Sequence, residues 1–211
     1  MRYFFYLIIF LLAGKILSAQ QNFVDVVAKY YRVNPFAGSF SAFVKALTTD
    51  PELLNKTILH KTDSTGYYAK GEYKVFNPFS MQANKVDMLF YEREMDFGDK
   101  MLSYYSYQLT VYFPNTEAYR KAVKKDYTKL SRLLQRVLPL VDIESLKGFR
   151  NISDGETTTF SDSYFAVKPV IISWQTLDKS NQLALSVVTN LIHMYNRAYP
   201  VSKDYLLEAI K

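Results

Sequence analysis

The feature that most constrains the fold is a change of the hydrophobic period to two residues between positions 57 and 113. Side chains of successive residues in a strand point to opposite faces, so a period of two indicates half-buried strands. Four such runs follow one another: TILHK, GYYAKGEYKVF, KVDMLFYERE and MLSYYSYQLTVYF. Turn-forming segments separate them, namely DSTG, NPFSMQAN and DFGD. The sequence therefore predicts an antiparallel meander of four strands.

The last of these runs has two chemically different faces. One face is apolar and is expected to join the core; it carries Met101, Tyr105, Tyr107, Leu109, Val111 and Phe113. The other face carries hydroxyl and amide groups: Tyr104, Ser106, Gln108, Thr110 and Tyr112. Tyr104 and Tyr112 are therefore candidates to meet solvent, a covering helix or a ligand. Packing alone is the simpler interpretation, because tyrosines exposed on a sheet are common.

Helical spacing predicts helices over residues 22–33, 36–48 and 116–138, and a short terminal helix over 203–210. The longest has an apolar stripe, begins after a capping residue at Asn115 or Thr116, and ends before Pro139. Its opposite face is strongly basic and carries Arg120, Lys121, Lys124, Lys125, Lys129, Arg132 and Arg136. A solvated helix face is the simpler explanation, but this is the strongest charged patch in the sequence and a candidate site for an anionic partner.

The second half of the chain is expected to contain an irregular loop at 143–163 and a hairpin whose second strand ends near residue 195. Sliding the sequence by 82 positions lays residues 89–113 over 171–195 and residues 36–48 over 118–130. The fold class is therefore predicted to be α+β: a single domain over 20–211, with antiparallel sheet and amphipathic helices on one face. The offset further suggests two related helix-plus-hairpin halves, 34–113 and 114–199.

The first 19 residues have the pattern of a secretory signal peptide. Arg2 precedes an apolar run that is too short to span a bilayer comfortably, and Ala19 lies before the expected cleavage point. Cleavage would lower the formal net charge from +6 to +4 and leave no transmembrane segment in the mature chain. An exported chain with no cysteine fits a bacterial periplasmic or secreted protein. An uncleaved amino-terminal anchor is the alternative.

The residue types disfavour most catalytic chemistry. There is no cysteine, and the only histidines are His60 and His193, both in predicted strands, which makes a histidine-based triad or a zinc site improbable. The carboxylates of Glu92, Glu94 and Asp96 share one strand face and could serve a hydrolase, although charges near a hairpin end also guard a sheet edge. We therefore predict no metal and no cofactor.

The sequence supports an exported, non-enzymatic binding or accessory protein that contacts a macromolecular or anionic partner. The partner could be a protein, a lipid or an anionic glycan, and nucleic acid is not expected for an exported chain. Two other hypotheses remain open. One is a carrier of small hydrophobic ligands or lipids, with a cavity between helix and sheet; the other is the carboxylate-based hydrolase.

Overall fold

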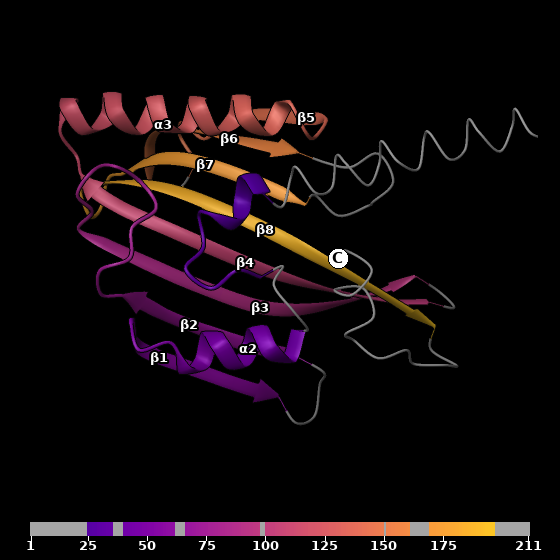
Figure 1. The fold of residues 1–211 in the computed structure, drawn as a ribbon. Helices are drawn as coiled ribbons and strands as arrows, with labels where there is room; N and C mark the ends of the chain where they lie inside the picture. The colour runs from indigo at the N-terminus through magenta and orange to yellow at the C-terminus, as the bar shows by residue number, and fades with distance from the viewer. Residues whose placement is uncertain are drawn as a thin grey trace, which may run out of the picture.

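The structure is a computed structural model and describes residues 25–35, 40–61, 66–97, 100–149, 151–160 and 169–196 (Figure 1). The predicted signal peptide at 1–19 and the predicted terminal helix at 203–210 lie outside these residues.

Eight antiparallel strands form one sheet in the spatial order β1-β2-β3-β4-β8-β7-β6-β5. In chain order, their bounds are β1 Leu53–Lys61, β2 Gly66–Tyr73, β3 Lys85–Phe97, β4 Lys100–Pro114, β5 Leu140–Ser145, β6 Ile152–Phe160, β7 Val170–Leu177 and β8 Gln182–Asn196. The predicted meander is confirmed, because β1 to β4 pair in sequence as antiparallel neighbours. The fold is α+β and consists mostly of sheet.

The prediction of an irregular loop over 143–163 is wrong. Residues of this segment form part of β5 and all of β6, which pair with each other, and β6 also pairs with β7. The error arose because the segment is polar and contains turn formers. Its threonines, Thr157 to Thr159, are β-branched and fit a pleated surface, and burial of Thr158 and Thr159 shows that polarity did not keep the segment outside.

The centre of the sheet is the long pair formed by β4 and β8. These strands pair along their whole lengths, from Lys100 opposite Asn196 to Pro114 opposite Gln182. One face of this pair, which we call the core face, is fully buried from Tyr107 to Phe113 in β4. The prediction that Tyr107, Leu109, Val111 and Phe113 join the core is confirmed; the side chains of Met101 and Tyr105 lie outside the described part.

Helix α2 (Phe40–Thr49) contacts the core face in the first half of the sheet. Phe43 meets the rings of Phe90 and Tyr107 edge-on, with centroids 5.4 Å away in each case. Residues 25–28 are helical, but the chain leaves the helix at residue 29. The prediction of a helix over 22–33 is therefore wrong for residues 29–33. The turn there lets both Tyr30 and Tyr31 be buried, which two successive residues of one regular helix achieve less readily.

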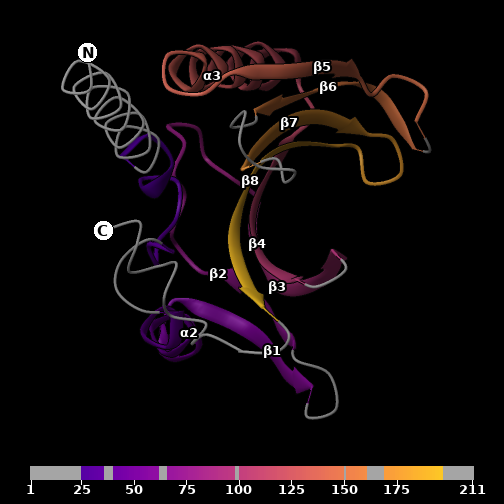
Figure 2. The same cartoon turned by 90° about the vertical axis from the view of Figure 1, so that its right-hand side faces the viewer.

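Helix α3 (Glu117–Gln135) lies over the second half of the sheet and contacts β6, β7 and β8. The hydroxyl of Thr116 caps it by accepting a hydrogen bond from the Tyr119 amide. Its buried residues are Val123, Tyr127, Leu130, Ser131 and Leu134, and Tyr127 shares a hydrogen bond with Thr158 of β6. Figure 2, which turns the view by 90°, shows α2 and α3 near opposite ends of the curved sheet.

Candidate functional site

The basic face of α3 forms a shallow groove of about 550 Å³ on the surface of the protein. Six of the seven basic residues predicted to bind a partner line this groove: Lys121, Lys124, Lys125, Lys129, Arg132 and Arg136. Thr128 and Leu133 complete the lining. We call these eight residues the basic groove. It is built by a single rigid helix, because residues three and four apart on an α-helix lie on the same face.

Few carboxylates neutralise the basic groove. Lys121 pairs with Glu117 at 3.6 Å in an exposed i,i+4 contact, and Lys124 pairs with Asp154 of β6 at 3.1 Å. Within the described ranges, no ion pair is seen for the other four cations of the groove: Lys125, Lys129, Arg132 and Arg136. Asp126 interacts electrostatically with Lys125 and Lys129 without forming an ion pair. The groove therefore keeps a net positive charge for an incoming anion.

Among the described contacts, Lys124 is the groove cation that is also tied to the sheet. Its Nζ lies 4.2 Å from the centroid of the Trp174 ring and 3.1 Å from the carboxylate of Asp154. A cation over the face of an indole is attracted by the ring quadrupole. Lys124 thus links the basic groove to the only tryptophan of the chain, which is buried in β7.

Arg120, the seventh predicted residue, does not line the basic groove. Its Nη2 donates a hydrogen bond to Asn115 Oδ1 at 3.0 Å, and Asn115 in turn donates to Asn181 Oδ1 at 2.9 Å. Arg120 Nε is buried and has no hydrogen-bond partner among the described residues. These contacts join the start of α3 to the turn between β7 and β8, so we assign Arg120 a structural role.

Tyr112 lies on the face of the sheet opposite the core face, as its alternation predicts. It is half-buried, and burial raises the pKa of its phenol, with the Asp87 carboxylate as a second cause. Two neighbours on this face, Ser106 and Thr110, are buried rather than free, and Thr110 Oγ1 lies 3.0 Å from Ser186 Oγ of β8. The side chain of Tyr104 lies outside the described part, while its backbone pairs with Ile192.

A second groove, of about 610 Å³, crosses this opposite face over β1 to β4 and includes Tyr112, Tyr68 and Gln108. Its charges are balanced: Lys85 lies 3.0 Å from Asp87 and 3.6 Å from Glu72. Lys70 also lines this groove, so its two lysines balance the carboxylates of Glu72 and Asp87 and it offers no net charge that would select an ionic partner.

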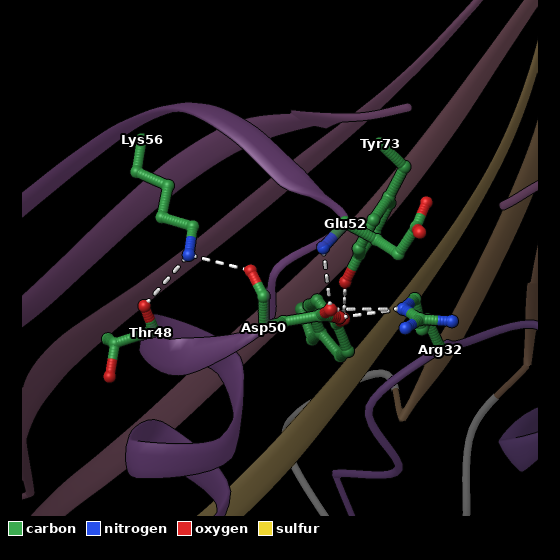
Figure 3. Close-up of polar contacts among 7 residues, drawn as sticks. Arg32, Thr48, Asp50, Glu52, Lys56 and Tyr73 are labelled. Atoms are coloured by element: carbon green, nitrogen blue, oxygen red, sulfur yellow. Dashed lines mark hydrogen bonds and ion pairs between the residues drawn. The ribbon is translucent and has the colours of Figure 1, made fainter. Parts of the chain in front are cut away.

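A polar cluster centred on the buried Asp50 joins the segment 25–35 to α2 and β1 (Figure 3). The carboxylate of Asp50 is buried and accepts hydrogen bonds from Arg32 Nε at 2.9 and 3.1 Å and from the Glu52 amide at 3.0 Å. The hydrogen bond from the Arg32 side chain to the Asp50 carboxylate is the main cause that raises the pKa of Arg32. Lys56 Nζ donates to the main-chain oxygens of Thr48 and Asp50, at 3.0 and 2.6 Å.

Three buried tyrosines continue this cluster across the sheet. Tyr73 and Tyr107 place their hydroxyls 3.3 Å apart, and the Tyr31 hydroxyl lies within hydrogen-bond distance of main-chain oxygens of both β4 and β8. Burial raises the pKa of Tyr73 to about 12 and the pKa values of Tyr31 and Tyr107 further. These phenols stay neutral and hydrogen-bonded, which suits them to hold the fold rather than to transfer protons near neutral pH.

The sequence did not reveal this cluster, because Arg32, Asp50 and Tyr73 belong to three separate segments. The only local signal was that Asp50 precedes a proline at the end of a predicted helix. Its partners depend on how the segment 25–35 crosses the sheet, which local patterns do not encode.

The described residues contain no group of three or more His, Cys, Asp or Glu residues that could hold a metal ion. The side chains of His60, His193, Glu92, Glu94 and Asp96 lie outside the described part, so the carboxylate-hydrolase hypothesis is not tested. Nor do the described helices include one with the length and apolar character needed to cross a membrane.

The lipid-carrier hypothesis is likewise not tested. Beneath α3, the side chains of Val123, Leu130 and Leu134 are buried, and Tyr127 bonds to the sheet. These contacts pack α3 against β6 and its neighbours in the sheet.

Comparisons with known proteins identify no relative. No family model matches the sequence, no curated protein matches it, and no solved structure matches the fold. The function must therefore be argued from the site itself.

Proposed function

We propose that this chain is an exported, periplasmic or secreted, non-enzymatic binding protein that contacts an anionic partner through the basic groove of α3. The observation that carries the proposal is the gathering of six cations on one helix surface, where only Lys121 and Lys124 form a described ion pair. Such a surface attracts and orients negatively charged molecules.

This clustering has a cost that the fold does not require. Like charges three or four positions apart, as in Lys121, Lys125 and Lys129, destabilise an isolated helix by about 0.2–0.5 kcal/mol per pair. The apolar stripe on the other side of α3 would bury equally well beneath neutral polar residues. A partner that neutralises the groove would offset this repulsion.

Export remains part of the proposal and rests on the sequence of residues 1–19. A basic residue, a short apolar run and a small residue before the expected cleavage point support it. Amino-terminal sequencing of protein recovered from the periplasm or medium of a producing bacterium tests it. We expect the recovered chain to begin at Gln20; recovery of the uncleaved chain in the cytoplasm would contradict export.

We also propose that the chain consists of two related halves, 34–113 and 114–199, each with an amphipathic helix packed on the same face of the sheet. In support, each half places one helix before four antiparallel strands, and the halves meet at β4 and β8. The 82-residue offset maps Lys100–Pro114 onto Gln182–Asn196, the bounds of these two strands. The same offset aligns the two helices less well than the strands, because it places buried Phe43 over exposed Lys125.

Retention on immobilised heparin, used as a model polyanion, tests the binding function. The test variant replaces Lys125, Lys129, Arg132 and Arg136 by glutamine, which preserves helix propensity while removing four charges. A matched control makes the same change at four exposed lysines outside α3: Lys45, Lys70, Lys74 and Lys179. We expect the test variant to elute at much lower salt than the control, and equal elution of the two variants would refute the proposal.

A further inference from the structure

We infer that the basic groove and the neighbouring edge strand β5 together form a surface that docks on an anionic lipid bilayer. This inference rests on the proposed function and narrows its partner class from anions in general to a membrane surface. It is carried by a second feature, a row of exposed apolar side chains, that an anionic polysaccharide would not need.

Strand β5 follows α3 in the chain and forms the edge of the sheet next to β6, which α3 contacts. The chain passes from the end of α3 at Gln135 to Leu140 through a short turn. Further along, Tyr127 of α3 bonds to Thr158, and Thr158 pairs in the sheet with Ile143 of β5. Figures 1 and 2 show β5 beside α3 at this edge of the sheet.

Three large apolar side chains are exposed along β5 and the turn that follows it. Leu140 is 43% exposed, Ile143 is 50% exposed and Phe149 is 60% exposed. Ile143 lies on the face of the sheet that α3 contacts, because its register partner Thr158 bonds to α3. The charged neighbours Asp142 and Glu144 alternate with Ile143 and therefore lie on the other face.

An edge strand is usually protected by charge, so apolar residues on the exposed side of β5 are unusual for a surface that meets only water. Cations beside apolar side chains are the combination that binds membrane interfaces: the cations attract anionic headgroups and the apolar groups enter the acyl boundary. Each basic side chain near an anionic bilayer contributes about fivefold in binding. Four such basic side chains together therefore strengthen binding to the anionic bilayer several-hundred-fold.

The opposite edge of the sheet provides a matched comparison within the same chain. There, Leu54 is 43% exposed and Val75 is 73% exposed, but neither lies on α3 or beside the basic groove. If apolar exposure alone drove membrane binding, this edge would bind as well as β5. The inference predicts that it does not.

Co-sedimentation with vesicles tests the inference, using equal parts phosphatidylglycerol and phosphatidylcholine and, for comparison, phosphatidylcholine alone. The apolar variant is Leu140→Ser, Ile143→Thr and Phe149→Ser, and its control is Leu54→Ser with Val75→Ser. We expect the wild type to bind only the anionic vesicles, the apolar variant to bind them at least about tenfold more weakly, and the control to bind like the wild type. Retention on heparin should be the same for all three proteins.

The vesicle and heparin measurements together distinguish failure of the inference from failure of the proposed function. Retention on heparin without binding to anionic vesicles, or an apolar variant that binds vesicles like the wild type, overturns the inference and leaves the proposed function standing. Absence of binding to both probes overturns both.

A second measurement avoids the risk that the triple variant misfolds. Because the chain has no cysteine, Phe149→Cys and Val75→Cys each give one site for an environment-sensitive fluorophore. Anionic vesicles should shift the emission of the label at position 149 to shorter wavelength and leave the label at position 75 unchanged. Equal responses at the two positions would overturn the inference.

Discussion

Removal of the Tyr31 hydroxyl should destabilise the protein while leaving its core packing intact. Tyr31 is 4% exposed, and its ring stacks on Tyr107 with centroids 4.3 Å apart. Its hydroxyl lies 2.8 Å from Thr189 Oγ1, 3.0 Å from the Tyr107 carbonyl oxygen and 3.2 Å from the Val187 carbonyl oxygen. One hydroxyl thus joins both central strands, β4 and β8.

Tyr31→Phe keeps the stacked ring and removes only this group. A neutral hydrogen bond contributes about 0.5–1.5 kcal/mol, and a buried polar group left without its partner costs about 1–3 kcal/mol. Thr189 is fully buried, so its hydroxyl would bear this cost. We expect Tyr31→Phe to lower the free energy of unfolding by about 2 kcal/mol.

Equilibrium urea unfolding, followed by circular dichroism and by the fluorescence of Trp174, measures this change. Thr189→Val replaces the hydroxyl by a methyl group of similar shape, so the double variant should be more stable than the sum of the single changes predicts, by about 1 kcal/mol. If Tyr31→Phe is as stable as the wild type, or if the two changes are additive, the hydroxyl does not join the strands as described.

Three further changes test other contacts. Because burial raises the pKa of Tyr73 to about 12, the folded state holds this proton more tightly than the unfolded state does. The free energy of unfolding should therefore be constant from pH 7 to about pH 9 and fall as the pH rises from about 10 to 12. This fall should be smaller in Tyr73→Phe. Asp50→Ala should cost about 1–3 kcal/mol in urea unfolding by leaving the Glu52 amide without its acceptor, whereas Asp50→Asn, which keeps an acceptor, should cost less. Lys124→Met should change the emission of Trp174 and cost about 0.5–1.5 kcal/mol. A flat alkaline profile, equal effects of the two Asp50 variants, or an unchanged Trp174 spectrum would contradict the corresponding contact.

The sequence predicted elements whose periodicity was undisturbed. Strand β4 has six apolar residues on one side and polar groups on the other, and its four described apolar residues, Tyr107 to Phe113, are buried as predicted. Helix α3 was predicted over 116–138 and spans Glu117–Gln135, because its apolar stripe and its cap at Thr116 both act locally. These signals need no knowledge of the rest of the fold.

Other features depend on contacts between distant segments. Strand β6 was missed because its threonines look like loop residues until β5 and β7 pair with it on both sides. Likewise, Ser106 and Thr110 lie on the face predicted to meet solvent, a covering helix or a ligand, and the sequence did not show that they are buried. Nothing near Thr110 in the sequence indicates its neighbour Ser186 in β8.

The candidate site was predicted as a set of residues but not as a surface. Helical periodicity gathers the cations of α3 on one side, which the sequence showed correctly for six of the seven. It could not show that Arg120 turns toward Asn115, nor that Leu140 and Ile143 of β5 are exposed. Both facts come from the turns that precede and follow α3.

Mapping of backbone amide chemical shifts during titration with heparin locates the bound anion most directly. We predict that the largest changes fall on residues 121–136 of α3, that they vanish at high salt, and that they are lost in the variant lacking the four cations. Largest changes over the second groove, around Tyr68 and Gln108, or changes spread evenly over the surface, would show that α3 is not the binding site.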